Sequence, residues 1–424
     1  MAGAGAGLLC LPVSTRGPGG EDPVTALFAS TSALCVTGLT VHDTASHFTA
    51  TGQVVLLVEM QLGGIGIMMF SSALGLLVAG RLRLRSRVPD QIETGFLDGG
   101  TLRRLVGGIL RISLLVEAAT WTALTLCLWL GHGTGFARAT YLGLFHSVSA
   151  FTNSGFTLWP DGMSGYRTDP LLLGPVLVAF TIGGIGYPVL LELGSGRRPG
   201  HWSLHTKITL VVSGVLMLIG PLVILCTEWS NPATIGGLPT GHRLLAGAFA
   251  GIAPRSSGFN VFDYSQAEDA TLMSTTALMF VGGGSSGTAG GIKVTTLAVL
   301  LLAVISELRG EADVNAFGRR IAPTTLRQAV TVIALHLAAI GAGALFLSLN
   351  SDVRFIFVLF DVTSATSTGG LSTGIAPDVP AAGHLMLVVL MFAGRIGTAL
   401  AVFMPALRRG NPAYRNPRAR PIIG

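Results

Sequence analysis

The chain has 424 residues, of which half are hydrophobic and only 11% are charged, and its formal net charge is +6 at neutral pH. Soluble chains carry about 25% charged residues, so this composition excludes an ordinary water-soluble protein and predicts an integral membrane protein with several spans. The positive charge does not indicate a nucleic-acid partner, because the basic residues gather in short clusters that follow apolar runs.

Six apolar runs have about the length that a helix needs to cross a bilayer. In chain order they are 53–79, 105–130, 171–193, 208–227, 325–350 and 384–407. Basic clusters occur at 81–87, 196–207, 309–320 and 408–420. Since positively charged short loops mark the cytoplasmic side, we expect these loops and the C-terminus to face the cytoplasm from a multi-pass protein of the cell membrane.

Four similar stretches recur about 110 residues apart, and each contains one glycine that leucine or phenylalanine follows. They are SALCVTGL, SAFTNSGF, IAPRSSGF and SATSTGGL, with their glycines at Gly38, Gly155, Gly258 and Gly370. Before each glycine lies an apolar segment of about a dozen residues, which is too short to span and predicts a re-entrant helix. We therefore predict four units of helix, half-helix, glycine loop and helix.

These units divide the chain into repeats at 1–88, 89–200, 201–320 and 321–424, with glycine loops near 35–39, 152–156, 255–259 and 367–371. Irregular backbone at membrane depth is stable only where it is buried in protein or lines a water-filled path, so four such loops predict one central pore. A ring of backbone carbonyls can replace the hydration shell of a monovalent cation. The alternative is that the four glycines only cap helices of a repeat-built transporter.

The predicted ion-binding residues of this selectivity filter are the glycines and the residues just before them. They are Val36, Thr37, Gly38, Asn153, Ser154, Gly155, Ser256, Ser257, Gly258, Thr368, Gly369 and Gly370. Glycine lets a carbonyl turn toward the ion without a clash from a Cβ atom. The half-helices would point their negative C-terminal ends at the same ion.

The four motifs, together with GGGSSGTAGGIK at 282–293, resemble the Trk/Ktr/HKT superfamily of potassium-uptake proteins, above all its bacterial Ktr-type membrane subunits. The resemblance covers essentially the whole chain. It implies an all-α polytopic membrane protein with four M1-P-M2 repeats (outer helix, pore helix, inner helix) around one pore, and not an enzyme. It also implies K+ as the transported ion, a homodimer in lipid, and a cytosolic nucleotide-binding RCK subunit as regulatory partner. In this family, glycine in all four filters goes with K+ preference.

The first repeat departs from the family pattern, because its outer M1 helix is largely missing and only LLCLPVST remains of it, with the apolar part at 8–13. We expect the genomic sequence upstream of Met1 to encode, in frame, about 20 more apolar residues. Truncation or divergence of this helix would be the alternatives. The filter assignment does not depend on it.

A second alignment follows the filters, with LGGIG at 62–66, IGGIG at 182–186 and AGRIG at 393–397. In the third repeat the same level falls within a glycine-rich run that cannot hold a helix. We predict that this run breaks the third inner helix and forms a gate below the filter. The predicted gate residues are Gly282, Gly283, Gly284, Ser285, Ser286, Gly287, Thr288, Ala289, Gly290, Gly291, Lys293 and Arg395. An arginine in an apolar helix marks function by default; alternatively, Arg395 only caps carbonyls of the broken helix.

Two other functions compete with a channel-like pore. The stretch GGGSSG at 282–287 matches the dinucleotide pattern G-x-G-x-x-G, but an apolar helix at 292–305 fills the interval to the next acid, Glu307, so we reject nucleotide binding by this chain. A Na+-coupled or H+-coupled symporter of the same superfamily stays as the alternative, since secondary transporters also use broken helices near the midplane. No cofactor is expected in this chain, apart from K+ as cargo and Na+ as a coupling or activating ion.

No transition-metal site is expected, because the four cysteines lack ligand spacing and His42, His47 and His146 lie around different loops. One acid follows each filter, at Asp43, Asp161, Asp263 and Asp378. These acids either concentrate cations at the pore mouth or cap the following helices, and the sequence does not choose between the two.

Overall fold

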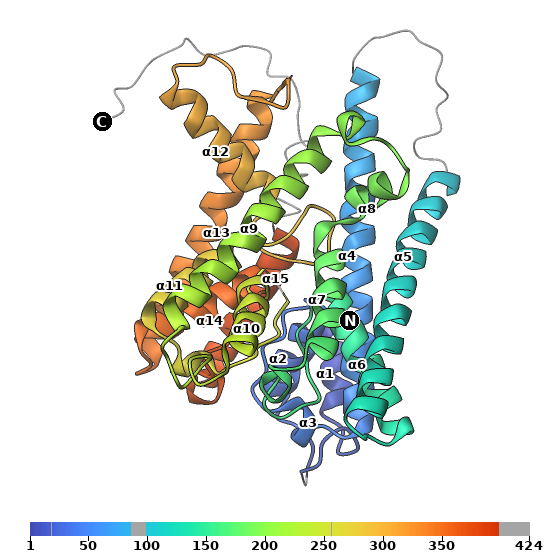
Figure 1. Cartoon of the computed structure of the whole chain (residues 1–424), viewed down its shortest axis with the longest axis vertical. Helices are drawn as coiled ribbons and strands as arrows, with labels where there is room; N and C mark the ends of the chain where they lie inside the picture. The colour runs from blue at the N-terminus through green and yellow to red at the C-terminus, as the bar shows by residue number, and fades with distance from the viewer. Residues whose placement is uncertain (18, 86–98, 256, 398–424) are drawn as a thin grey trace.

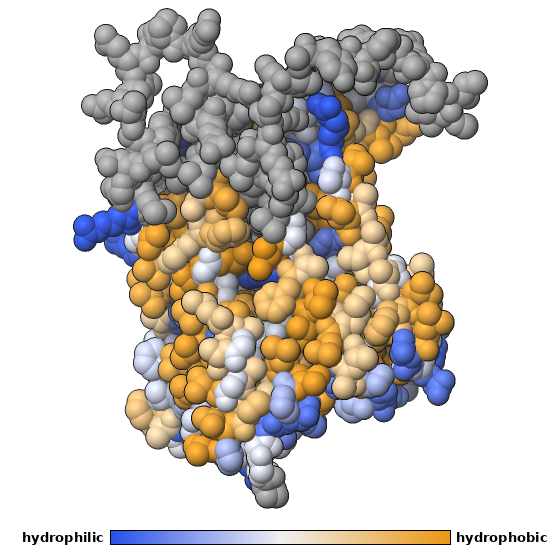
Figure 2. All heavy atoms as spheres, turned by 180° about the vertical axis from the view of Figure 1, so that it is seen from behind, coloured by the Kyte–Doolittle hydropathy of each residue, from blue (hydrophilic) through white to orange (hydrophobic). Residues whose placement is uncertain are grey.

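The computed structural model describes residues 1–17, 19–85, 99–255 and 257–397, and helices make up nearly all of its regular structure. Within these ranges four helices are long and apolar enough to cross a membrane, or five if one bent pair counts as a single span. In Figure 1 the long helices run roughly along the vertical axis, and several shorter ones, among them α1, α2 and α3, lie in the lower half. Hydrophobic side chains cover much of the lateral face, with hydrophilic ones at the lower end (Figure 2). The fold is that of a polytopic all-α membrane protein, as predicted.

Three long outer helices lie where the second, third and fourth repeats were predicted to begin. They are α5 (Gly99–Leu126, continued by the π-helix η1, Cys127–Gly131), α9 (Leu204–Glu228) and α13 (Pro323–Asn350). In the first repeat the corresponding helix is α1 (Ala2–Leu9), which contacts α2 and α4. The helix therefore covers residues earlier than the predicted apolar part at 8–13, because alanine and glycine of AGAGAGLL form it. The hydroxyl of Ser30 donates to the Ala2 carbonyl at 2.8 Å and ties α1 to α2.

Four short pore helices each end at a predicted glycine loop. They are α2 (Pro23–Leu34), α6 (Phe136–Thr152), α10 (Thr240–Ile252) and α14 (Phe355–Ser367). Their labels all lie in the lower half of Figure 1. The start of α2 is set by Asp22, whose carboxylate accepts hydrogen bonds from the amides of Val24 and Thr25 at 3.0 and 3.2 Å. The predicted half-helices before the glycine loops are thus present.

The inner helices differ from repeat to repeat. They are α4 (Ala50–Arg85), the pair α7 (Pro170–Ile185) and α8 (Tyr187–Gly194), the pair α11 (Asp269–Phe280) and α12 (Val294–Leu308), and α15 (Ala381–Phe392) with the π-helix η6 (Ala393–Gly397). The break between α11 and α12 is the one predicted. The single span predicted at 171–193 is wrong in shape, because α7 and α8 meet at 101°. Residues after 397, which include the basic cluster at 408–420, lie outside the described ranges.

The connections add short elements. They are α3 (Thr44–His47), the 3-10 turns η2 (Ser164–Tyr166), η3 (Pro199–His201), η4 (Tyr264–Gln266) and η5 (Ala376–Asp378), and the antiparallel strands β1 (Asn315–Ala316) and β2 (Arg319–Arg320). The strands pair Asn315 with Arg320 and Ala316 with Arg319. This hairpin joins α12 to α13 within the basic cluster predicted at 309–320. The predicted bounds of the four repeats stay a prediction.

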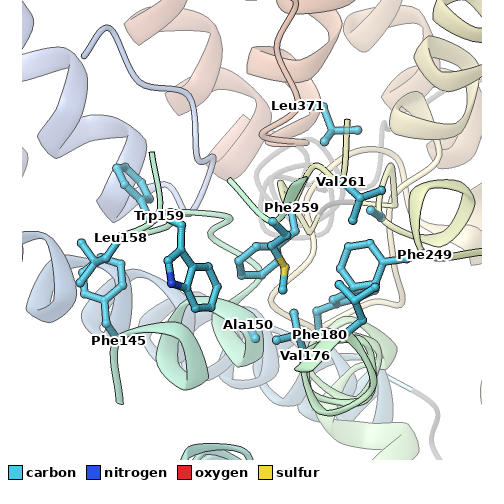
Figure 3. Close-up of a cluster of buried hydrophobic side chains, with 14 of the residues drawn as sticks. Phe145, Ala150, Leu158, Trp159, Val176, Phe180, Phe249, Phe259, Val261 and Leu371 are labelled. Carbon is cyan, nitrogen blue, oxygen red and sulfur yellow. The ribbon is translucent and has the colours of Figure 1, made fainter. Parts of the chain in front are cut away.

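The largest buried hydrophobic cluster surrounds the glycine loops and joins residues of all four repeats. Figure 3 shows part of it, with Phe145, Phe180, Phe249 and Phe259 among its aromatic side chains. His146 lies in this cluster and stacks on Trp159 with ring centroids 3.6 Å apart. Its Nδ1 donates to the Leu142 carbonyl at 2.7 Å, and its Nε2 accepts from the Leu158 amide at 3.2 Å. His146 is therefore a buried residue of the scaffold around the loops.

Candidate pore and gate

The pore helices of the first, second and fourth repeats end in the same turn. Two residues before the filter glycine, Val36, Asn153 and Thr368 adopt left-handed φ angles of 57°, 61° and 48°. The next amide donates to the carbonyl five residues back, from Thr37 to Ser32 at 2.7 Å, from Ser154 to Ser149 at 2.9 Å and from Gly369 to Ser364 at 2.7 Å. These bonds satisfy carbonyls at the helix end and turn the chain sharply toward the filter.

The third repeat ends its pore helix in a different way. Ser256, the residue equivalent to Val36, lies outside the described ranges. The amide of Ser257 donates to the Ala253 carbonyl, four residues back, at 3.0 Å. A Cβ atom on Gly258 would nevertheless lie 2.8 Å from the Gly155 Cα, so the third loop reaches the same level of the molecule as the second.

The four filter glycines meet in one closed ring. Their φ angles are 92° at Gly38, 71° at Gly155, 72° at Gly258 and 80° at Gly370. A Cβ atom on Gly38 would collide with the Ser154 carbonyl, and one on Gly155 would lie 2.9 Å from the Ser257 carbonyl oxygen. A Cβ atom on Gly258 would lie 3.3 Å from the Gly370 Cα, and one on Gly370 would collide with the Thr37 carbonyl. Each contact joins one repeat to the next, and the last joins the fourth repeat to the first.

Such a ring offers backbone oxygens to a cation at the point where four pore helices end. Glycine is required at each position for two reasons, since the φ angles are positive and the neighbouring loop leaves no room for a side chain. Backbone carbonyl oxygens can replace the hydration shell of a monovalent cation, and the helix C-termini add a negative potential. The assignment of a selectivity filter to these residues stays a prediction.

One buried acid that sequence reasoning missed is Asp361, which lies in α14 with only 2% of its surface exposed. Its carboxylate accepts from the Ser372 hydroxyl at 2.6 Å and from the Thr373 amide and hydroxyl at 2.9 and 3.0 Å. These bonds fix the chain where it leaves Gly370. The available signal was a lone acid inside an apolar re-entrant segment, FIFVLFDVTSA, which marks function by the same argument as Arg395.

The acids after the filters separate into two groups. Asp43 accepts from the amides of Ala45 and Ser46 at 3.3 and 2.9 Å and caps α3, and Asp263 accepts from the Ser265 amide at 2.9 Å and caps η4. For these two acids the capping interpretation therefore holds. The other two, Asp161 and Asp378, are exposed.

Below the ring, the first glycine of each aligned motif lets an inner helix contact the end of a pore helix. A Cβ atom added to Gly63 would collide with the Leu34 carbonyl. In the same way, one on Gly183 would collide with the Phe151 carbonyl, and one on Gly394 with the Thr366 carbonyl. The small residues noticed in the sequence are thus sites of helix contact. The motifs diverge at the next position, where Gly64 and Gly184 correspond to Arg395.

The predicted gate loop lies between α11 and α12 and closes on itself at its base. Val281 forms a bridge with Ile292, and the Gly282 amide donates to the Ile292 carbonyl at 2.9 Å. Close to this base, a Cβ atom on Gly290 would collide with the Thr368 hydroxyl. The loop therefore lies directly below the filter of the fourth repeat.

The same loop pairs with the bend of the second inner helix. Pro188 has no N–H to donate to the Gly184 carbonyl four residues back, and this carbonyl accepts from the Gly284 amide at 2.8 Å. Likewise the Gly183 carbonyl accepts from the Thr288 amide at 3.0 Å. The bend at Gly186, where φ is 103°, thus exposes carbonyls that the loop satisfies.

Two of the predicted gate residues bring positive charge to the loop. Arg395, 6% exposed, donates from Nη1 to the Thr288 carbonyl, and Lys293 donates from Nζ to the Ala289 carbonyl at 2.6 Å. The structure thus brings Arg395 onto the loop, across 107 residues of sequence. This bond is common to both interpretations of Arg395, as an anchor of the gate and as a cap.

A third cation, Arg255, was missed by sequence reasoning although it stands within the filter motif APRSSGF. Its Nη2 donates to the Gly282 carbonyl at 3.4 Å, and its Nη1 donates to the Ser213 carbonyl at 3.1 Å. Arg255 therefore links the third pore helix, the third outer helix and the first residue of the gate loop. Its signal in the sequence was a charge next to a glycine loop at membrane depth.

Comparison with known proteins gives matches along most of the chain. The family model TrkH, described as a cation transport protein, matches residues 22–406. The chain is 36% identical to the Ktr system potassium uptake protein B of Bacillus subtilis, over 94% of this chain and 89% of that protein. It is 30% identical to the potassium/sodium uptake protein NtpJ of Enterococcus hirae, over 99% and 94% of the two chains. The crystal structure of the potassium transporter TrkH from Vibrio parahaemolyticus shares its fold with a TM-score of 0.68 and 18% identity, covering 92% of this chain and 79% of that one.

Proposed function

Because this chain belongs to the TrkH family of cation transport proteins, we propose that it takes up potassium ions across the cell membrane through the ring of four glycine loops. It is a multi-pass membrane transporter and not an enzyme. The ions pass the ring one after another, held by backbone carbonyls of Thr37, Ser154, Ser257 and their neighbours. Uptake follows the inward electrical gradient.

The observation that carries this proposal is the closure of the ring. Four segments that are about 110 residues apart in sequence meet through contacts so close that a methyl group at Gly38 or Gly370 would overlap the next repeat. Helix caps in a transporter would need positive φ angles but no mutual contact. A shared ring is what carbonyl coordination of one ion requires, and the potassium uptake proteins named above match the chain over most of its length.

The gate in this proposal is the loop 282–291. It lies under the filter of the fourth repeat, and Arg395 and Lys293 hold it through the carbonyls of Thr288 and Ala289. Two cationic groups close to the path repel a partly dehydrated K+, and the low dielectric of the membrane interior increases this repulsion. Conduction requires the loop to leave its contacts on α7 and α8.

Control of this gate falls to a cytosolic nucleotide-binding RCK subunit, which binds a homodimer of this chain on the side of the basic loops. The relative from Bacillus subtilis carries a name that places it in a Ktr system. In this arrangement the basic loops at 196–207 and 309–320 face the cytoplasm and the apolar lateral face contacts lipid. Few hydrogen bonds join the loop to the α7–α8 bend, so binding of the partner can break them and move the loop.

A coupled symporter is the second candidate, and one observation favours it. The relative NtpJ is named a potassium/sodium uptake protein, and the match to it covers 99% of this chain. In this alternative Na+ crosses with K+ or activates its transport. Dependence of K+ uptake on a Na+ gradient or on a proton gradient distinguishes a symporter from a channel-like pore.

The proposed function is tested in cells that lack other potassium uptake systems. We expect the chain to restore growth at low K+ and to carry Rb+, with weak competition by Na+. Uptake should persist when the Na+ and proton gradients are removed separately while the membrane potential is clamped. Failure to restore growth by a protein that reaches the membrane would contradict potassium uptake, and loss of uptake without Na+ would favour the symporter.

A further inference from the structure

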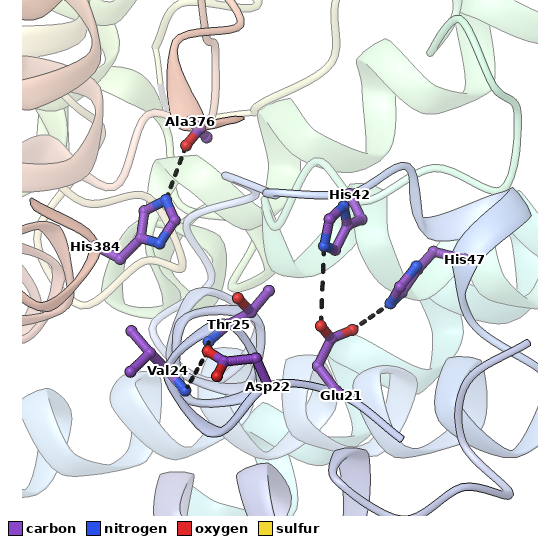
Figure 4. Close-up of polar contacts among 8 residues, drawn as sticks. All are labelled: Glu21, Asp22, Val24, Thr25, His42, His47, Ala376 and His384. Atoms are coloured by element: carbon purple, nitrogen blue, oxygen red, sulfur yellow. Dashed lines mark hydrogen bonds and ion pairs between the residues drawn. The ribbon is translucent and has the colours of Figure 1, made fainter. Parts of the chain in front are cut away.

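Three side chains that sequence reasoning left apart converge next to the first filter loop. They are Glu21, His42 and His47, which Figure 4 shows with both imidazoles turned toward one carboxylate. The His42 Nε2 lies 3.8 Å from Glu21 Oε1, and the His47 Nε2 contacts Glu21 Oε2. All three ligand atoms lie within 4.8 Å of one another.

Each of the three residues is held by a different segment. Glu21 precedes Asp22, which caps α2, so its backbone is fixed at the start of the first pore helix. His42 lies in the loop four residues after Gly38. His47 ends α3, and its carbonyl accepts from the Arg16 amide at 2.9 Å. The two imidazoles also stack on one another, with centroids 4.3 Å apart.

We propose that these three side chains bind a divalent transition-metal ion of the zinc class. Two imidazole nitrogens and one carboxylate oxygen form a set that Zn2+ prefers, and they leave a fourth position for water or a further ligand. The Glu21 side chain is 5% exposed, whereas His42 is 45% and His47 28% exposed, so an ion reaches a nearly buried carboxylate from the imidazole side. This replaces the expectation of no transition-metal site.

The sequence did not signal this site because its ligands come from three segments on both sides of a filter loop. His42 and His47 are separated by four residues, but they lie in a loop and a single-turn helix and not on one helical face. Glu21 comes from before the pore helix. Only the return of the chain after Gly38 toward the start of α2 brings them together.

A metal ion here lowers potassium flux, and this second step rests on the proposed function. The ion ties the segment before α2 to the loop that leaves Gly38, which restricts the first filter loop. It also adds two positive charges near the entrance, which lowers the local concentration of cations. Metal binding does not depend on either of these two effects on flux. Metal binding and ion flux are therefore measured separately.

The binding test must also remove a second group of potential metal ligands in the described part of the chain, so that it cannot bind the added ion. This group is Cys127, His132 and Asp169. In that group His132 Nε2 lies 2.7 Å from Asp169 Oδ2. All variants therefore carry His132→Ala. The full chain in lipid nanodiscs is titrated with Zn2+ by calorimetry, and with Co2+ by its absorption bands, which report tetrahedral coordination.

We expect one Zn2+ per chain in the His132→Ala background and at least about tenfold weaker binding after His42→Ala or His47→Ala. Glu21→Gln keeps the shape of the side chain and should weaken binding in the same way. His242→Ala, which removes an exposed histidine of α10, is the matched control and should leave binding unchanged. Equal Zn2+ affinity in the background, His42→Ala and His47→Ala proteins would overturn the site, as would no binding in the background.

The flux test uses Rb+ uptake into proteoliposomes with Zn2+ on the side that faces the filter. We expect inhibition in the His132→Ala background, relief by a chelator, and loss of inhibition in His47→Ala. Zn2+ binding without inhibition would overturn the effect on flux and leave the metal site in place. No Rb+ uptake even in metal-free protein would refute the proposed potassium transport, and it would not bear on metal binding.

Discussion

The level of the glycine ring and the level of the gate loop are built from the same four repeats in opposite ways. At the ring, Gly38, Gly155, Gly258 and Gly370 share positive φ angles and close contacts. One level below, α4 is one continuous helix, α7 bends into α8, a loop separates α11 from α12, and η6 carries a buried arginine. All four repeats contribute the same kind of glycine loop to the ring, whereas each repeat contributes a different structure to the gate level.

In the proposed function the difference follows from the role of each level. An ion on the axis would be coordinated from several sides, so equivalent loops are favoured at the ring. A gate needs one movable part and fixed partners for it, so the repeats diverge below. The first glycines of the motifs, Gly63, Gly183 and Gly394, keep the helix contacts that both levels share.

The largest effect should come from placing a side chain in the ring. Gly258→Ala puts a Cβ atom 2.8 Å from the Gly155 Cα and 3.3 Å from the Gly370 Cα, at a φ of 72°. Strain and overlap of about 3 kcal/mol correspond to a roughly 100-fold loss of Rb+ uptake. Gly374→Ala is the control, because Gly374 has a φ of 82° and open space around it. Equal uptake by the two variants would mean that the ring tolerates side chains.

Removal of the gate loop should act in the opposite direction. Deletion of residues 285–289 takes away Thr288 and Ala289, whose carbonyls bind Arg395 and Lys293. We expect about tenfold higher flux at saturating K+, which corresponds to a barrier lowered by about 1.4 kcal/mol. Flux into liposomes is measured with and without the regulatory partner, and regulation should weaken. A stable deletion variant with lower flux would show that the loop is a structural part of the path.

Arg395→Ala leaves the loop in place but removes one charge and one hydrogen bond that anchors the loop. We expect a smaller rise in K+ flux, of about threefold. Combined with the deletion, it should add little, since both changes act on one barrier. Arg354→Ala is the matched control, because that arginine is exposed and pairs with Asp269 at the surface. Lower flux together with a lower unfolding temperature would instead identify Arg395 as a structural cap.

A modest effect is expected at the exit of the fourth filter loop. Asp361→Asn keeps one carbonyl oxygen for the Thr373 amide and hydroxyl, but this acceptor is no longer charged. Its NH2 group replaces the oxygen that accepts from the Ser372 hydroxyl, so that bond is lost. We expect a loss of about 1–2 kcal/mol in stability and a small loss of K+ preference. Thermal unfolding and competition of Na+ with Rb+ uptake measure the two. Unchanged values of both would exclude Asp361 from the support of the filter.

Much of this architecture could be predicted because glycine leaves a clear signal in sequence. The four filter glycines follow from their period, and the break after Phe280 follows from a run that cannot hold a helix. The bend at Gly186 could not be predicted from its motif, since LGGIG in α4 stays helical while IGGIG bends. Pro188 and the loop that pairs with the freed carbonyls make the difference, and that pairing is tertiary. Asp361, Arg255 and the Glu21 group likewise depend on contacts between distant segments.

The central claim is that the ring selects K+ through glycine in each repeat, and Gly38→Ser tests it most directly. Its Cβ would overlap the Ser154 carbonyl at a φ of 92°, whereas Gly374→Ser introduces the same residue at a φ of 82° with nothing nearby. The measurement is the competition of Na+ with Rb+ uptake by the two variants and the parent chain. The account predicts that Na+ competes more strongly in Gly38→Ser alone. An unchanged ratio in Gly38→Ser would contradict it and remove Gly38 from the filter.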